Sequence, residues 1–173
     1  MYARKVGINH YVKLESTEGK TAAAATNQEV GKLGGEIVVN MDYDNTGGVS
    51  DLLSNYHNLS SALEHEKLHY ETARGDGLEH AELFSEAMLT ENFKRSSQDF
   101  KDRVVKGMIG ELAEGLHGFT READVKGFFE KFNEQNSSTL GYNVEYLGTG
   151  NFTDYDAYNF KMGEVVVSIE KIR

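Results

Sequence analysis

The stretch His65-Glu66-Lys67-Leu68-His69 matches the pattern HExxH, and it is the most informative part of the chain. On a helix, residues four apart lie one turn above each other on the same face, so the two imidazoles can bind one zinc ion together. Glu66 lies beside them, where its carboxylate can accept a proton from the attacking water. A zinc ion lowers the pKa of water to about 7 and polarises a carbonyl group, and both effects promote peptide hydrolysis. The stretch therefore predicts a zinc-dependent peptidase site.

The residues around the motif predict that it lies on a helix. Residues 59–64 contain no glycine, no proline and no β-branched run. At about 100° per residue, the two histidines and Glu66 share a face with the small residue Ala62. Lys67 falls on the opposite face and can reach solvent, although zincins usually have an uncharged residue there, and Glu64 is atypical in the same way. The alternative is a solvated helix whose charged residues form the pattern by coincidence, and the helical context favours the metal site.

The ends of this helix and the start of a second one are also predicted. Asn58 or Ser60 is a candidate N-cap, and the glycine-containing residues 75–77 are expected to end the helix near Arg74. A second helix should begin at residue 78, and because the connection is short it should run back beside the first. A catalytic zinc site needs a third protein ligand and one open position for water, so this second helix is where we look for the ligand.

Three side chains of the second helix are candidates for the third zinc ligand: His80, Glu82 and Glu86. His80 and Glu82 are about 200° apart on a helix, so they are not expected to bind the same ion. Imidazole has the stronger intrinsic preference for zinc, so we place His80 first, Glu82 second and Glu86 third. The alternative for each glutamate is an ordinary exposed carboxylate.

Two zincin subclasses can be compared with this pattern. Metzincins have a glycine three residues and a histidine six residues after the HExxH motif, where this chain has Thr72 and Gly75, so that subclass is excluded. The pair Glu82-x-x-x-Glu86 resembles the Glu-x-x-x-Asp second helix of gluzincins, with Glu in place of Asp.

The segment from Ala62 to Met88 resembles the C-terminal metallopeptidase toxin domains of Rhs-type bacterial polymorphic toxins. Those domains share an HEKxH-like helix that is closely followed by a helix with a His-Ala-Glu or His-x-Asp word, and here that word is His80-Ala81-Glu82. The resemblance implies a zinc-dependent peptidase toxin that is delivered by a bacterial secretion system and acts on a peptide or protein substrate. It also implies a cognate immunity protein as a partner.

The composition limits the other function classes. The chain of 173 residues, 39% hydrophobic and 27% charged, is expected to be globular, and no apolar run or signal peptide indicates a membrane span or a classical export route. A net charge of −10 argues against a nucleic-acid partner. The chain has no cysteine and no proline, which would suit a domain that is threaded through a secretion machine and then refolds. Without such delivery, the cytoplasm is the expected location.

Hydropathy patterns predict one α+β domain over residues 1–173, in which a zincin-like pair of active-site helices packs on a small sheet, with further helices and C-terminal strands. Residues 4–14 and 36–41 are predicted strands, and the alanine-rich residues 20–33 between them are expected to be helical. In zincins an edge strand beside the active helix pairs with the substrate backbone, and residues 36–41 are the natural candidate.

The second half of the chain predicts two helices followed by strands. Apolar residues with helical spacing form core-facing stripes at 100–116 and 125–132, with Thr120 as the expected cap of the later helix. Strands are predicted at 142–147 and 164–172.

Between these strands, residues 148–158 have the composition of a surface hairpin loop. The alternative is a catalytic role, in which Tyr155 or Tyr158 donates a hydrogen bond to the oxyanion of the tetrahedral intermediate.

Two further function classes are compatible with the sequence. One is a binding or immunity-type protein with a metal-free motif, which predicts no bound zinc. The other is a purely structural zinc site, in which a fourth protein ligand closes the coordination shell and removal of the metal unfolds the chain. The peptidase hypothesis instead predicts bound zinc and loss of activity in Glu66→Gln with the fold intact.

Overall fold

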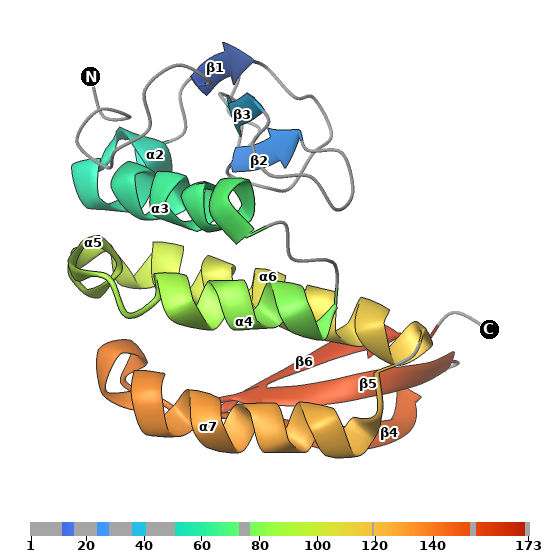
Figure 1. The fold of residues 1–173 in the computed structure, drawn as a ribbon. Coiled ribbons are helices and arrows are strands. Elements are labelled where there is room, and N and C mark those ends of the chain that lie inside the picture. Colours follow the sequence, from blue (N-terminus) through green and yellow to red (C-terminus); the bar gives the residue numbers. More distant parts are fainter. Residues whose placement is uncertain are drawn as a thin grey trace. The chain divides into compact units, whose positions relative to one another are not determined.

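The computed structural model describes residues 12–15, 24–27, 36–40, 51–72, 77–118, 120–152 and 155–171. The chain divides into two compact units, and each is considered by itself (Figure 1). The first comprises Met1–Gly75 and Glu86–Lys101, and the second comprises Asp76–Ser85 and Asp102–Arg173. The helices and strands confirm the predicted α+β class, while a single domain over residues 1–173 and its zincin-like character stay predictions.

The first unit contains a three-stranded sheet of β1 (Val12–Glu15), β2 (Ala24–Asn27) and β3 (Glu36–Asn40). β3 is the central strand, parallel to β1 and antiparallel to β2. The prediction that residues 36–41 form an edge strand is therefore wrong. Ile37 pairs with Val12 on one side and with Thr26 on the other, and its side chain is fully buried.

The alanine-rich segment 20–33 is not helical where the structure describes it, since Ala24–Asn27 is strand β2. Alanine favours helices by well under 1 kcal/mol per residue over most residue types, so pairing with β3 outweighs that preference. The predicted strand 4–14 is described only from Val12 onward, and its earlier residues lie outside the described part of the chain.

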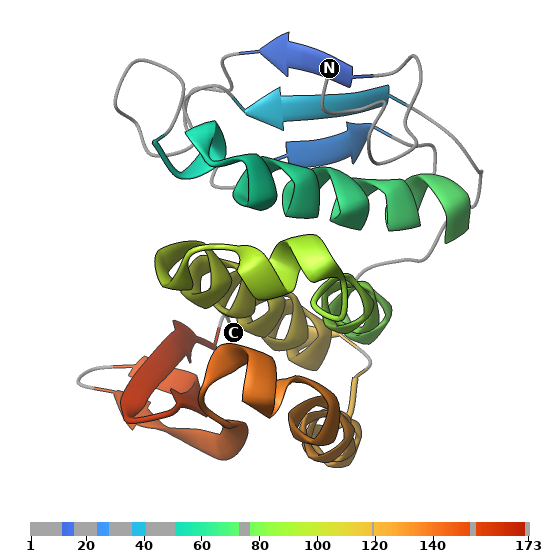
Figure 2. The ribbon, with the colours of Figure 1, turned by 90° about the vertical axis from the view of Figure 1, so that its left-hand side faces the viewer.

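In the described part of the first unit, the helices that accompany this sheet are α2 (Asp51–Ser54), α3 (Tyr56–Thr72) and α5 (Glu91–Arg95). Figure 2 shows the sheet lying along one side of α3, with β2 beside the helix. α3 ends close to the predicted position, and Arg74 itself lies outside the described residues.

The predicted N-caps of α3 are wrong, because Asn58 and Ser60 lie inside the helix. Asn55 precedes the helix, and its side-chain oxygen accepts hydrogen bonds from the backbone N–H groups of His57 and Asn58. Asn58 is buried and joins three segments instead: its amide donates to Leu52 O and to Ser97 Oγ, and its oxygen accepts from Ser97 N. A polar residue near a helix start can therefore be a buried connector rather than a cap.

The second unit combines α4 (Leu78–Ala87), most of α6 (Gln98–His117) and α7 (Glu122–Leu140) with an antiparallel sheet. The strands β4 (Val144–Phe152), β5 (Tyr155–Met162) and β6 (Val165–Glu170) follow each other in that order. α7 lies along one face of this sheet (Figure 1). The side chain of Asn133 accepts from Val144 N and donates to Val144 O, which joins the helix to the first strand.

The apolar stripes of α6 and α7 are confirmed as core. The fully or nearly fully buried members are Phe100, Met108, Ile109, Leu112, Val125, Phe129 and Phe132. Val104, Leu116 and Phe128 of these stripes are only half-buried, and the fully buried residue next to Val104 is Val105. The expected cap Thr120 is wrong by one residue, because Arg121 is the N-cap of α7 and makes no side-chain cap bond.

The predicted hairpin loop at 148–158 is largely strand. β4 continues to Phe152 and β5 begins at Tyr155. The register shifts between Tyr146 and Gly148, where Gly148 has φ 97°, a left-handed conformation that glycine adopts without strain. This bulge explains the error, since a glycine within a strand can mark a bulge as well as a turn. Within the described residues, no helix is long and apolar enough to cross a membrane.

Candidate metal centre

His65 and His69 meet on one face of α3, as the HExxH spacing predicts. Their Nε2 atoms lie 3.2 Å apart, and their rings meet edge to face with centroids 4.8 Å apart. His65 is buried and His69 is half-buried. The two rings therefore present the same nitrogen to a common point.

The separation of these nitrogens can be tested against a metal. Zinc binds imidazole nitrogen at about 2.0–2.1 Å, so two ligands of a tetrahedral ion lie about 3.3 Å apart. The observed 3.2 Å between Nε2 of His65 and Nε2 of His69 is close to this value. The histidine pair fits a zinc ion without a change of rotamer.

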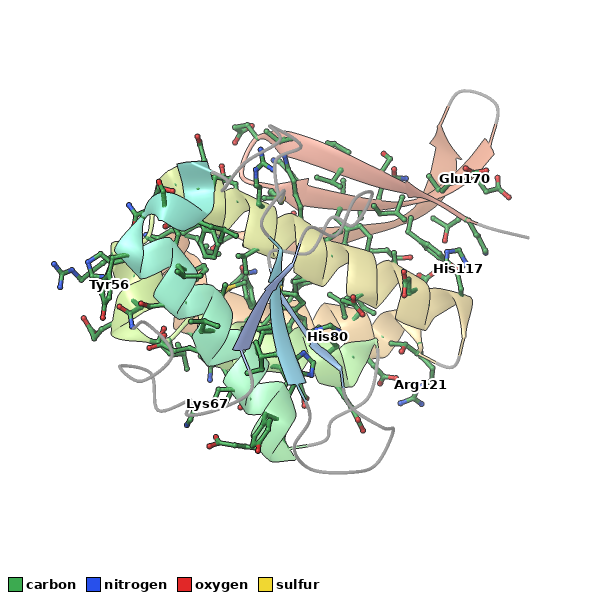
Figure 3. All side chains as sticks on the ribbon, turned by 90° about the horizontal axis from the view of Figure 1, so that it is seen from above. Tyr56, Lys67, His80, His117, Arg121 and Glu170 are labelled. Carbon is green, nitrogen blue, oxygen red and sulfur yellow. The ribbon has the colours of Figure 1, made fainter. Side chains whose placement is uncertain are left out.

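Glu66 and Lys67 lie on different sides of α3. Glu66 is buried, with 5% of its surface exposed, so it is largely shielded from solvent. Lys67 lies on the outer side of the helix (Figure 3), and its Nζ is 3.0 Å from an oxygen of Glu71. The prediction that Lys67 reaches solvent on the face away from the histidines is confirmed.

The atypical Glu64 has a local structural role. Its Oε1 accepts a 2.6 Å hydrogen bond from the amide of Asn92 on α5, and the oxygen of Asn92 lies 3.0 Å from His57 Nδ1. These contacts connect α3 to α5 on the face next to the histidines. The acid before the motif is therefore explained by helix packing within the first unit.

His80 belongs to the second unit and lies near the start of α4. Its Nδ1 lies 2.9 Å from Oε2 of Glu111 on α6, and its ring stacks on Phe84 with the two planes inclined by 19°. Only 19% of the His80 side chain is exposed. The ring is thus held both at one nitrogen and on one face.

The other two candidate ligands have a different environment. Glu82 and Glu86 are both exposed on α4. Among the described residues, the histidine and acidic side chains that could together hold a metal ion are His65, His69 and His80. This set contains His80, the candidate that zinc ligand chemistry favours, and it contains neither Glu82 nor Glu86.

The chain also matches a known protein family. A family model described as metallopeptidase toxin 2 matches residues 1–142, most of the chain. The chain belongs to the metallopeptidase toxin 2 family. No curated protein and no solved structure gives a significant match.

Membership of the metallopeptidase toxin 2 family confirms the resemblance to metallopeptidase toxin domains. It indicates a hydrolase that acts on protein and, together with the three histidines, a metal cofactor. The match covers both histidine-bearing helices and ends before β4, so the C-terminal sheet lies outside it.

The tyrosines that were candidate oxyanion donors lie in β5 of this metallopeptidase toxin 2 chain. Tyr158 is buried, and its hydroxyl donates to the carbonyl of Leu116 over 3.1 Å. Its ring also meets His117 edge to face and lies 5.5 Å from Lys171 Nζ. An oxyanion role for Tyr158 would require the bond to Leu116 to break. Tyr155 begins the strand, and its side chain lies outside the described residues.

Sequence reasoning did not identify Glu111. It lies among the apolar stripe of α6, on a different helix from the histidine that it contacts. Its partner depends on how α4 and α6 are aligned, and no local spacing in the sequence carries that information.

Proposed function

We propose that this member of the metallopeptidase toxin 2 family is a zinc-dependent peptidase of the zincin type. His65, His69 and His80 would hold the zinc ion, and Glu66 would be the general base. The observation that carries the proposal is the 3.2 Å separation of the two Nε2 atoms on α3, which suits two ligands of one tetrahedral ion.

The bound ion would supply the acidification of water and the polarisation of the substrate carbonyl. Glu66 follows the first histidine directly, and its buried carboxylate would accept the proton of the attacking water. The same carboxyl group would then donate that proton to the leaving amine, so that it returns to its starting state. Burial supports this role, because a carboxylate away from bulk water is not diverted by solvent hydrogen bonds.

His80 is the proposed third ligand because imidazole suits zinc and because its ring is already held in place in the second unit. Glu82 and then Glu86 remain the alternative third ligands. Both are exposed, as glutamates on protein surfaces ordinarily are. Three protein ligands would leave a fourth position for water, the arrangement of catalytic rather than structural zinc sites.

Substrate backbone pairing is proposed for β2 in place of the central strand β3. Among the described strands of the first sheet, β2 is an outer one, and it lies beside α3, which carries Glu66. An outer strand offers unpaired backbone groups to an extended peptide, and main-chain hydrogen bonds of this kind position a substrate without demanding a particular side chain.

The toxin family supports delivery of the chain out of the producing bacterium and a cognate immunity protein as its partner. Both are part of this proposal. A peptidase that acts on general cell proteins would harm its producer, so a protein that blocks the metal centre before delivery is the expected safeguard.

The proposal is tested by measuring metal content in the purified wild type and in His65→Ala. We expect about one zinc per chain in the wild type and a loss of zinc in the variant. Absence of zinc from wild type that has been supplied with zinc would contradict the proposal and favour a metal-free binding protein. Bound zinc without hydrolysis, and unfolding when a chelator removes the metal, would favour a purely structural site.

A further inference from the structure

We propose that Glu111 on α6 is a positioning residue of the metal centre, whose carboxylate holds the His80 ring so that Nε2 is presented to the ion. This inference rests on the proposed metal site and extends it. The contact that carries it is the 2.9 Å separation of His80 Nδ1 and Glu111 Oε2. Neither the HExxH pattern nor the family match points to this glutamate.

The chemistry of the pair determines which nitrogen is available. An ionised carboxylate only accepts hydrogen bonds, so the ring nitrogen that faces Glu111 must carry a proton. A neutral His80 then has its lone pair on Nε2, which is the form that binds a metal. Metal-binding histidines commonly donate their other N–H to a carboxylate, and this bond orients the ring and raises its basicity.

The packing of α4 against α6 within the second unit holds the pair in place. Contacts between the two antiparallel helices recur about one turn apart, and they are Gly77 with Gly115, His80 with Glu111 and Phe84 with Gly107. The stacking of His80 on Phe84 adds a second restraint on the ring. Glu111 is therefore placed by its helix rather than by a flexible surface contact.

A control residue lies on the same helix. Glu114 is exposed, three residues after Glu111, whereas only 26% of the Glu111 side chain is exposed. Glu111→Ala and Glu114→Ala each remove one negative charge from α6, and each introduces one alanine, so the two variants match in charge and in helix propensity. A difference between the two variants therefore reports on the contact with His80 and not on charge.

The test is the zinc affinity of the full chain, measured by competition with a chromogenic chelator, beside the urea stability of the metal-free protein. Glu111→Ala should bind zinc about 10–100-fold more weakly than wild type. Glu111→Gln keeps a neutral acceptor for the Nδ1 proton and should recover part of the loss. Glu114→Ala should bind as the wild type does. If Glu111→Ala does not fold, the comparison of Glu111→Gln with Glu114→Ala decides the matter.

A double-mutant cycle separates positioning from direct ligation. In a His80→Ala background, Glu111→Ala should cause no further loss of zinc affinity, because the carboxylate acts through the ring. A loss that persists in this background would overturn the inference and make Glu111 a metal ligand itself. Wild-type affinity in Glu111→Ala would overturn the inference and leave the proposed function standing. Failure of the wild type to bind zinc would overturn the proposed function, and the inference with it.

Discussion

Gly115 of α6 lies against Gly77, the residue before α4, so closely that a Cβ on Gly115 would be 3.2 Å from Gly77 Cα and 2.7 Å from Thr120 Oγ1. Gly77 itself has φ 66°, a backbone conformation that is strained for a residue with a side chain. This contact sets the start of the helix that carries His80. The absence of a side chain at both positions is therefore a packing requirement of the second unit.

We predict that Gly115→Ala destabilises the chain by about 1–3 kcal/mol, because backbone of Gly77 or the side chain of Thr120 must move to admit the methyl group. Gly110→Ala in the same helix is the matched control, since a Cβ there would meet nothing within 4 Å. It should stabilise the chain by about 0.5–1 kcal/mol through helix propensity. Urea denaturation of the metal-free proteins measures both, and equal effects would contradict the packing argument.

A second prediction concerns the buried amide of Asn58, which contacts Leu52 and Ser97 through three hydrogen bonds. Asn58→Ala should lower the free energy of unfolding by about 2–4 kcal/mol, because buried backbone groups lose their partners. Glu71→Gln, which breaks only the solvent-accessible pair with Lys67, should cost less than about 1 kcal/mol. Thermal denaturation compares the two, and a small effect of Asn58→Ala would show that water replaces the amide.

The parts of the fold that sequence predicted well are those determined by local pattern. The motif helix and the helix after the glycine turn follow from spacing along one segment, as do the apolar stripes of α6 and α7. The histidine pair belongs to the same class, because residues four apart on a helix must share a face.

The errors arise where distant segments decide the structure. Residues 24–27 are a strand because β3 pairs with them, and no property of an alanine-rich segment reports that partner. The bulge at Gly148 resembles a turn in composition, yet the strand continues beyond it. Glu111 was missed for the same reason, since its contact with His80 exists only once α4 and α6 have packed.

A third prediction concerns alkaline pH. The Tyr142 hydroxyl donates a 2.8 Å hydrogen bond to Asp102, and burial first and this bond second raise the pKa of the phenol well above its ordinary value of 10.0. A raised pKa means that the folded chain holds the proton more tightly than the unfolded chain. Its contribution to stability is therefore complete below pH 10 and is lost as the pH rises above that value.

The comparison of wild type with Tyr142→Phe isolates this effect. The variant should be less stable below pH 10, since it lacks the bond to Asp102, and the difference should shrink as the pH rises further. Urea denaturation across this pH range measures the difference, and phenolate absorbance follows the titration. A difference that does not change with pH would show that the phenol ionises alike in the folded and unfolded chains.

The last prediction separates the chemistry of Glu66 from metal binding. Glu66→Gln keeps the size of the side chain and removes its basicity, so zinc content and urea stability should stay close to wild type while turnover falls by about 10²–10⁴-fold. Hydrolysis of fluorescently labelled casein by the zinc-loaded chain measures turnover, and growth of a bacterial host that produces the chain provides a second readout. Glu71→Gln, an exposed position on the same helix, should leave turnover and toxicity unchanged. Retained activity in Glu66→Gln would remove Glu66 as the base. Loss of zinc together with activity would instead place the carboxylate among the groups that hold the metal.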